Sequence, residues 1–337
     1  MQFTLNAKPI VVNPFFKQIK RKERAMKSRV LVMIVSIGFL FSVSLLTQHA
    51  TATIVGNPPP SGIPITGEWR FLVFLVEFEE QDAKHDPAHD LDYYDNLLLS
   101  MSGDPDNPSM SLRDYYREVS YFYREDFEGW DIAYVDYADP DPAGDGWIEA
   151  PQPYSHYDYS PPGQSGRELV KDVINDHPEI DYTQYQNNPN LNYASVIVIY
   201  SSGISNPWSF YSAIRSDEVD VDGLGGVQYC IVPEDASLSR LAHEVGHHIA
   251  FPDLYAKAKA LGYWCIMSRG SQHPDALCKI IAGWIEPEVV KEDRVEVPIP
   301  DIEHNRVVFK LQSYVLPEKE YFLVANRQQN NGFDSFF

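Results

Sequence analysis

Short apolar runs and segments with helical apolar spacing alternate along about the first 250 residues of the chain. The apolar runs predict buried strands, and the spaced segments predict helices that pack on them. The predicted strands are 70–78, 128–137, 194–200 and 227–232, and the predicted helices begin at Ser111 or span 167–175 and 238–249. This alternation is typical of an α/β domain. After residue 290 the pattern becomes β-rich, with strands predicted at 294–298, 306–311 and 319–326.

The segment 238–249 has a clear amphipathic pattern. Its apolar residues recur at spacings of three and four and make one stripe, formed by Leu238, Leu241, Ala242, Val245 and Ile249. His243 and His247 point away from this stripe with Glu244 to one side of them, and Asp235 or Ser237 is a suitable N-cap. We therefore expect a helix that buries one face in the core and turns its histidine face toward a cleft.

Residues 243–247 read His-Glu-Val-Gly-His, the most informative stretch of the chain for its chemistry. Two histidines four apart on a helix present two imidazoles to one metal ion, and the adjacent glutamate reaches a metal-bound water. Solvated surface histidines would explain the polarity of this face but not the glutamate between them. We therefore interpret His243 and His247 as zinc ligands and Glu244 as a general base.

A catalytic zinc site needs a third protein ligand, because the fourth position is kept for water. Asp253 lies six residues beyond His247, and Pro252 enforces an extended residue before it, so the chain can fold back after the helix. Glu286 and Glu288 are the alternative third ligands, but the proline between them suits a loop better than a ligand-bearing helix.

The remaining histidines are given structural or surface interpretations. His85 and His89 are also four apart, but Pro87 lies between them, so a polar loop is the better interpretation. His248 and His273 lie near the motif in sequence, and we interpret them as surface histidines, with a substrate-facing role as the alternative.

The N-terminal part predicts an export signal. Residues 30–46 carry no charge, and Lys27 and Arg29 lie just before them. The small-x-small sequence that ends at Ala52 favours cleavage after that residue, and Met26 is well placed as the start of the basic region. Residues 1–25 would then be an upstream extension. An uncleaved anchor is the alternative, because the apolar run is near the lower length limit for a spanning helix.

The charge of the remaining chain is strongly negative. Residues 1–52 hold eight basic residues and one acidic residue, so residues 53–337 carry a net charge of about −28. This surface argues against nucleic acid and anionic membranes as partners and suits a soluble exported protein. The stretch 136–145 contains several aspartates that could bind calcium, but an acidic loop is the better interpretation.

The chain has three cysteines, at Cys230, Cys265 and Cys278. An odd number in an exported protein leaves at least one thiol free or paired between chains. Cys265 and Cys278 are the closest pair in sequence, and none of the three has Cys-x-x-Cys spacing. Packing residues or one disulfide remain open as interpretations.

Together these residues resemble the immune inhibitor A-type zinc metallopeptidases, a secreted bacterial family related to the metzincins. The family pattern is His-Glu-x-x-His-x-x-Gly-x-x-Asp, followed by a tyrosine and a Trp-x-Leu-Met-Ser methionine turn. The chain meets it at His243, Glu244, His247, Asp253, Tyr255, Trp264, Met267 and Ser268. The resemblance covers roughly residues 70–334 and includes 111–120, 282–285 and 321–328.

The resemblance implies a zincin- or metzincin-like α/β (α+β) catalytic domain with a mixed twisted sheet and an active-site helix. It also implies a secreted, bacterial zinc endopeptidase that acts on proteins or peptides. His243, His247 and Asp253 would hold Zn²⁺, Glu244 would accept a proton from the attacking water, and Met267 would be an apolar floor beneath the metal. In zinc peptidases a strand in the place of 227–232 often forms the rim along which an extended substrate lies.

The sequence departs from the family pattern at three places. Ala250 stands where the family has glycine, which costs about 1 kcal/mol or more if this residue is left-handed. Residues 184–192 lack the acidic, glycine-containing stretch often found there, which argues against a calcium site. The chain stops at Phe337, where family members normally continue.

These features predict four parts. They are an extension with a signal peptide (1–52), a proline- and glycine-containing linker (53–69), a zinc metallopeptidase domain (70–290) and the start of a truncated β-rich region (291–337). An inactive relative that serves as a surface or binding protein with a structural metal is the alternative function. The intact Glu244 favours the enzyme, whereas Ala250 and the early stop favour the alternative.

Overall fold

The computed structural model describes residues 10–11, 35–36, 40–45, 64–80, 84–102, 109–139, 144–157, 162–188, 191–201, 209–255, 261–270, 272–291, 295–311, 321–328 and 333. The chain divides into two compact units, a larger one formed by Ile54–Pro252 and a smaller one formed by Met1–Thr53 with Asp253–Phe337. The predicted signal peptide and linker lie largely outside the described residues, and the predicted domain boundaries stay predictions.

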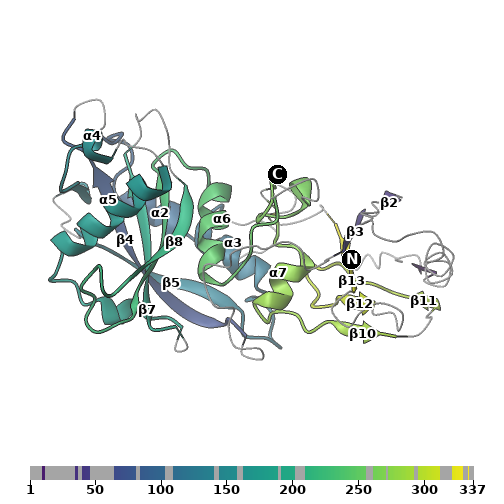
Figure 1. Cartoon of the computed structure of the whole chain (residues 1–337). Coiled ribbons are helices and arrows are strands. Elements are labelled where there is room, and N and C mark those ends of the chain that lie inside the picture. The colour runs from purple at the N-terminus through teal and green to yellow at the C-terminus, as the bar shows by residue number, and fades with distance from the viewer. Residues whose placement is uncertain are drawn as a thin grey trace. The chain divides into compact units, whose positions relative to one another are not determined.

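The larger unit is built on a mixed six-stranded sheet (Figure 1). Its strands follow the order β5-β4-β7-β9-β8, and β6 also pairs with β4. Their bounds are β4 Gly67–Glu77, β5 Trp130–Tyr137, β6 Trp147–Glu149, β7 Tyr193–Tyr200, β8 Phe210–Arg215 and β9 Gly226–Pro233. All neighbours are parallel except β8, which runs antiparallel to β9. The mixed α/β fold predicted from the sequence is thus confirmed.

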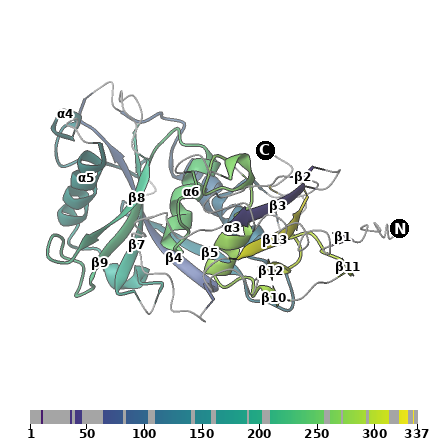
Figure 2. The ribbon, with the colours of Figure 1, turned by 45° about the vertical axis from the view of Figure 1, so that its right-hand side comes forward.

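Helices cover both faces of this sheet, with α5 on one side and α3 and α6 on the other (Figure 1, Figure 2). The helices of this unit are α2 Leu91–Leu99, α3 Leu112–Val119, α4 Tyr154–Tyr157, α5 Pro162–Asp176 and α6 Leu238–His248, with a 3₁₀ turn at Tyr182–Tyr185. Alternate residues of β4 face opposite layers. Leu72 and Phe74 join the apolar cluster with Val173 of α5, whereas the ring of Phe71 lies against His248 of α6.

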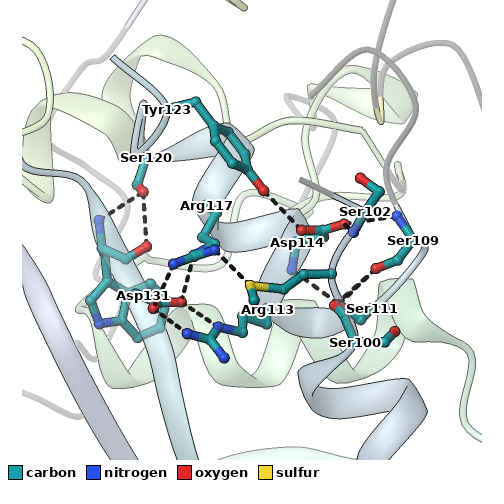
Figure 3. A network of polar contacts seen from close by, with 12 residues as sticks. Ser100, Ser102, Ser109, Ser111, Arg113, Asp114, Arg117, Ser120, Tyr123 and Asp131 are labelled. Carbon is teal, nitrogen blue, oxygen red and sulfur yellow. Dashed lines mark hydrogen bonds and ion pairs between the residues drawn. The ribbon is translucent and has the colours of Figure 1, made fainter. Parts of the chain in front are cut away.

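A buried ionic network fixes α3 on the sheet (Figure 3). Asp131 of β5 is fully buried and pairs with Arg113 at 2.7 Å and with Arg117 at 2.9 Å, both from α3. Ser111 caps this helix by accepting a hydrogen bond from the backbone N–H of Asp114 at 3.0 Å, as the sequence predicts. Two charges that share one buried carboxylate hold α3 in register with β5.

The smaller unit is β-rich. Its five-stranded sheet has the order β10-β12-β13-β3-β2, and β1 pairs separately with β11. The bounds are β1 Ile10–Val11, β2 Val35–Ser36, β3 Leu40–Leu45, β10 Glu288–Val290, β11 Val295–Val297, β12 Phe309–Leu311 and β13 Phe322–Arg327, with 3₁₀ helix η3 Gly262–Trp264 and helix α7 Ala276–Ile281. The last three strands fall within or beside the predicted ones. That this region is truncated stays an expectation.

One family-based expectation about the sheet is wrong. The strand at 227–232 was expected at the rim, but β9 lies inside the sheet, between β7 and β8. The outer position belongs to β8, a strand that the sequence pattern did not predict. Among the described residues, no helix has the length and apolar character required to cross a membrane.

Candidate metal centre

Helix α6 is positioned at its start and along its buried face. The Ser237 hydroxyl accepts a hydrogen bond from the backbone N–H of Arg240 at 3.3 Å, which selects Ser237 from the two predicted N-caps. The stripe residues Leu241 and Val245 are buried, and the hydroxyl of Tyr116 on α3 donates to the carbonyl of Ala242 at 2.5 Å. The helix is therefore held to the layer beneath it, and the opposite face carries the histidines.

The structure brings together three of the predicted site residues. One ligand atom from each of His243, Glu244 and His247 lies within 4.8 Å of the others. The two imidazole rings are 5.1 Å apart and nearly perpendicular, and both are half-buried. Glu244 is only 7% exposed. Two imidazoles and a carboxylate converge on one region that remains partly accessible, as a catalytic metal site requires.

A backbone contact orients His247. Its Nδ1 lies 2.7 Å from the carbonyl oxygen of Phe251, and since a carbonyl only accepts, Nδ1 carries the proton. This tautomer puts the ring's lone pair on Nε2, the arrangement in which a histidine binds zinc while its other nitrogen donates to a carbonyl. The residues present thus fit a zinc ion.

The turn that supplies this carbonyl contains a left-handed alanine. The backbone N–H of Phe251 bonds to the carbonyl of Gly246 and that of Ala250 to the carbonyl of His247, which is the hydrogen-bond pattern of a Schellman motif. Ala250 lies at the left-handed position of that motif, with φ of 66°. The condition stated for the cost of alanine is therefore met, and this conformation costs about 1 kcal/mol.

Asp253 is the first residue of the smaller unit, and its role as a zinc ligand stays a prediction. The next residue, Leu254, donates its backbone N–H to the carbonyl of Met267 at 2.7 Å. Met267 is fully buried and lies in a turn closed by a hydrogen bond of 2.9 Å from Ser268 N–H to the Cys265 carbonyl. Met267 therefore lies in a turn that is hydrogen-bonded to the segment after Asp253, and its role beneath a metal stays a prediction.

Two histidines were interpreted wrongly. His248 and His273 are 2% and 0% exposed, so neither is a surface residue. Burial, with a smaller effect from the neighbouring His247, lowers the pKa of His248 to about 3 and keeps its ring neutral. Among the residues that the structure describes, neither ring nitrogen of His248 has a hydrogen-bond partner, and the ring packs against Phe71.

Tyr211 on β8 is a further neighbour of the candidate site that no motif in the sequence points to. Its ring lies 5.6 Å from that of His247 and 5.0 Å from that of His248, so it flanks the histidine face of α6. The only signal in the sequence is a short run of β-favouring residues at 210–214.

The alternative ligands and sites gain no support. Glu286 and Glu288 are exposed, and Glu288 begins strand β10. His85 and His89 lie in a loop, as predicted, and pair with Glu77 and Glu234. Within the described residues, the groups of three or more potential ligands do not include the aspartates of 136–145, so calcium there is unsupported.

The comparison with known families agrees with this geometry. The model of the immune inhibitor A peptidase M6 catalytic domain matches residues 212–281, which include α6, the methionine turn and α7. Residues 212–281 are thus similar to the catalytic domain of this family. The resemblance found in the motif is thus confirmed, and it supports a metallopeptidase, a hydrolase of peptide bonds in proteins or peptides. No curated protein matches the chain.

Proposed function

We propose that the chain is a secreted zinc endopeptidase of the immune inhibitor A type, in which Glu244 is the general base. The observation that carries the proposal is the convergence of His243, Glu244 and His247 within 4.8 Å inside the matched segment. The hydrogen bond from His247 to the Phe251 carbonyl supports it, because a purely structural surface histidine does not need a fixed tautomer.

Each residue has a defined task in this proposal. His243, His247 and Asp253 would hold the ion, and a zinc ion held there would lower the pKa of water and polarise the scissile carbonyl. Glu244 would take the proton of the attacking water and deliver it to the leaving amine. The burial of Glu244 limits competing solvent and keeps its carboxylate beside the two imidazoles.

The sheet edge suggests how a substrate is aligned. In the described part of the sheet β8 is outermost on its side, and α6 packs against it. The backbone groups of an edge strand can pair with an extended peptide, and Tyr211 would bring such a peptide close to His247. An endopeptidase that binds extended protein segments fits this arrangement better than an enzyme for compact small substrates.

Export is part of the proposal. The basic, apolar and small-residue regions that end at Ala52 support a cleaved signal peptide, and the acidic remainder suits an extracellular bacterial enzyme. Cleavage after Ala52 would remove β3 from β13, leaving β13 at the edge of its sheet.

Casein hydrolysis by the full chain tests the proposal. Glu244→Gln keeps the size of the side chain but cannot accept the proton, so we expect a loss of about 10²–10⁴-fold in kcat/KM. Bound zinc, measured by atomic absorption, should remain at one ion per chain. A chelator should abolish the wild-type activity, and added zinc should restore it.

Glu218→Gln is the matched control, because it makes the same chemical change at an exposed residue of the same unit. It should retain wild-type activity. A folded, zinc-loaded wild type that does not cleave casein would refute the enzyme and favour the inactive relative with a structural metal.

A further inference from the structure

The smaller unit contains a second group of reactive side chains that the peptidase chemistry does not use. The sulfur atoms of Cys265 and Cys278 and a carboxylate oxygen of Asp275 all lie within 4.8 Å of one another. Both cysteines are fully buried and Asp275 is 4% exposed. Cys265 lies between η3 and the methionine turn, and Cys278 lies in the first turn of α7.

The local structure holds the two thiols against each other. Asp275 caps α7 by accepting the backbone N–H of Cys278 at 3.0 Å, and its own backbone N–H donates to the sulfur of Cys265 at 3.3 Å. A disulfide bond is about 2.05 Å long, so the sulfur atoms need to close by less than about 3 Å.

We propose that Cys265 and Cys278 form a disulfide bond that fastens the methionine turn to helix α7. Cys230 is fully buried on β9, a strand of the larger unit, and lies outside the proposed pair. The odd cysteine of the sequence is then Cys230, and it remains a buried thiol.

Zinc is the competing occupant of this group, and two observations disfavour it. Structural zinc sites are closed by four ligands, whereas the group within the described residues has three. The guanidinium of Arg327 favours the charged form of Asp275, so a positive charge already acts on one of the three donors.

The bond forms by thiol–disulfide exchange with a small-molecule or protein disulfide. One thiolate attacks the oxidant and forms a mixed disulfide, and the second thiolate displaces the remaining oxidant thiol. The two cysteines lose two electrons and two protons, and the oxidant disulfide becomes two thiols. Because both sulfur atoms are fully buried in the folded chain, the exchange takes place before α7 packs against the turn.

The bond would also restrain the chain near Asp253. The turn that begins at Cys265 contains Met267, whose carbonyl accepts the N–H of Leu254. A disulfide bond at Cys265 would thus limit the motion of the segment next to Asp253. The importance of this restraint for zinc binding rests on the proposed function, but the bond itself does not.

Thiol counting on the full chain tests the bond. The protein is refolded in a buffer of oxidised and reduced glutathione, unfolded in urea without reductant, alkylated and weighed. We expect one alkylated cysteine, Cys230, and a proteolytic peptide pair joined through Cys265 and Cys278. Cys230→Ala should give no alkylation, and Cys278→Ala should give two alkylated cysteines.

A stability measurement covers the case in which a variant folds poorly. Reduction should lower the urea midpoint of the wild type and leave that of Cys278→Ala unchanged. Three alkylated cysteines in the folded wild type would overturn the proposal. So would a zinc ion that persists in His243→Ala and is lost in Cys278→Ala. Neither readout depends on peptidase activity, so failure of the disulfide and failure of the proposed enzyme are distinguishable.

Discussion

The His243–Glu244–His247 group of the larger unit and the Cys265–Asp275–Cys278 group of the smaller unit each bring three donor atoms within 4.8 Å. The first group keeps half-buried imidazoles, and the backbone carbonyl of Phe251 sets the tautomer of one of them. The second is closed to solvent and holds a thiol whose pKa burial raises. Both groups therefore bring their donor atoms close together, but they differ in access to solvent and in the kind of donor that they hold.

This difference shows that the burial of a donor decides its chemistry as much as its identity does. A ligand must be deprotonated when it binds a metal, and a neutral imidazole meets this condition near neutral pH without further help. A buried thiol meets it only if a positive charge or the metal itself offsets the cost of ionisation. On this basis we propose a metal for the first group and a covalent bond for the second.

The largest expected effect is on bound zinc, which should depend on the His243–Glu244–His247 group and not on the Cys265–Asp275–Cys278 group. His243→Ala removes a direct ligand, so we expect zinc affinity to fall well beyond the roughly 10–100-fold that an outer-shell partner contributes. Cys278→Ala should leave zinc at one ion per chain. Equilibrium dialysis with atomic absorption measures both, and His156→Ala, an exposed histidine of the larger unit, is the control. Zinc loss in Cys278→Ala would reverse the assignment of the two groups.

The buried carboxylates of the two units provide a second test, beginning with Asp131. Asp131→Asn removes the charge of a fully buried carboxylate and leaves the partly buried guanidiniums of Arg113 and Arg117 without their ionic partner. We expect the free energy of unfolding to fall by about 3–5 kcal/mol, measured by urea denaturation. A loss below 1 kcal/mol would mean that water reaches these guanidiniums and replaces the carboxylate.

The same substitution at Asp275 should raise the free energy of unfolding, whereas at Asp131 it lowers it. Burial raises the pKa of Asp275 above its ordinary 3.8, and its Oδ2 has no hydrogen-bond partner within the described part of the chain. The native state therefore holds the proton more tightly than the unfolded chain, so the stability from this group is full below pH 3.8 and falls as pH rises through the folded-state pKa.

Asp275→Asn removes this penalty and keeps the cap on the Cys278 N–H, because asparagine is an equally good N-cap. We expect a gain of about 1–3 kcal/mol at pH 7 that shrinks as the pH approaches 4. Urea denaturation at several pH values checks it. A loss of stability at pH 7 would indicate that the carboxylate is charged and paired, as in a metal site.

The sequence predicts helix α6 well because the information there is local. The stripe, the N-cap and the His243–His247 spacing all lie within one short segment. The position of β8 at the sheet edge is not local, since it depends on pairing with β9 and on which strand lies outermost. The contact between Cys265 and Cys278 likewise depends on how a turn meets a helix.

The error at His248 has a different cause. His248 lies seven residues after Leu241 and three after Val245, so helical spacing places it on the buried stripe. The polarity of histidine led to a surface interpretation, although the spacing predicts burial. The position of His248 on the helix therefore determines that it is buried. Its neutral ring packs between the rings of Phe71 and Tyr211.

The smallest expected effect concerns the turn that supports His247. Ala250→Gly relieves the left-handed strain at φ of 66°, so we expect a gain of about 1 kcal/mol in the free energy of unfolding. Ala236→Gly, at an alanine that is not left-handed, is the control and should bring no gain. Zinc affinity should not change in either variant, because the hydrogen bonds to Gly246 and His247 already place the Phe251 carbonyl beside Nδ1 of His247. An increase in zinc affinity for Ala250→Gly would instead mean that strain in the turn weakens the orientation of His247, and would couple the stability of this turn to the metal centre.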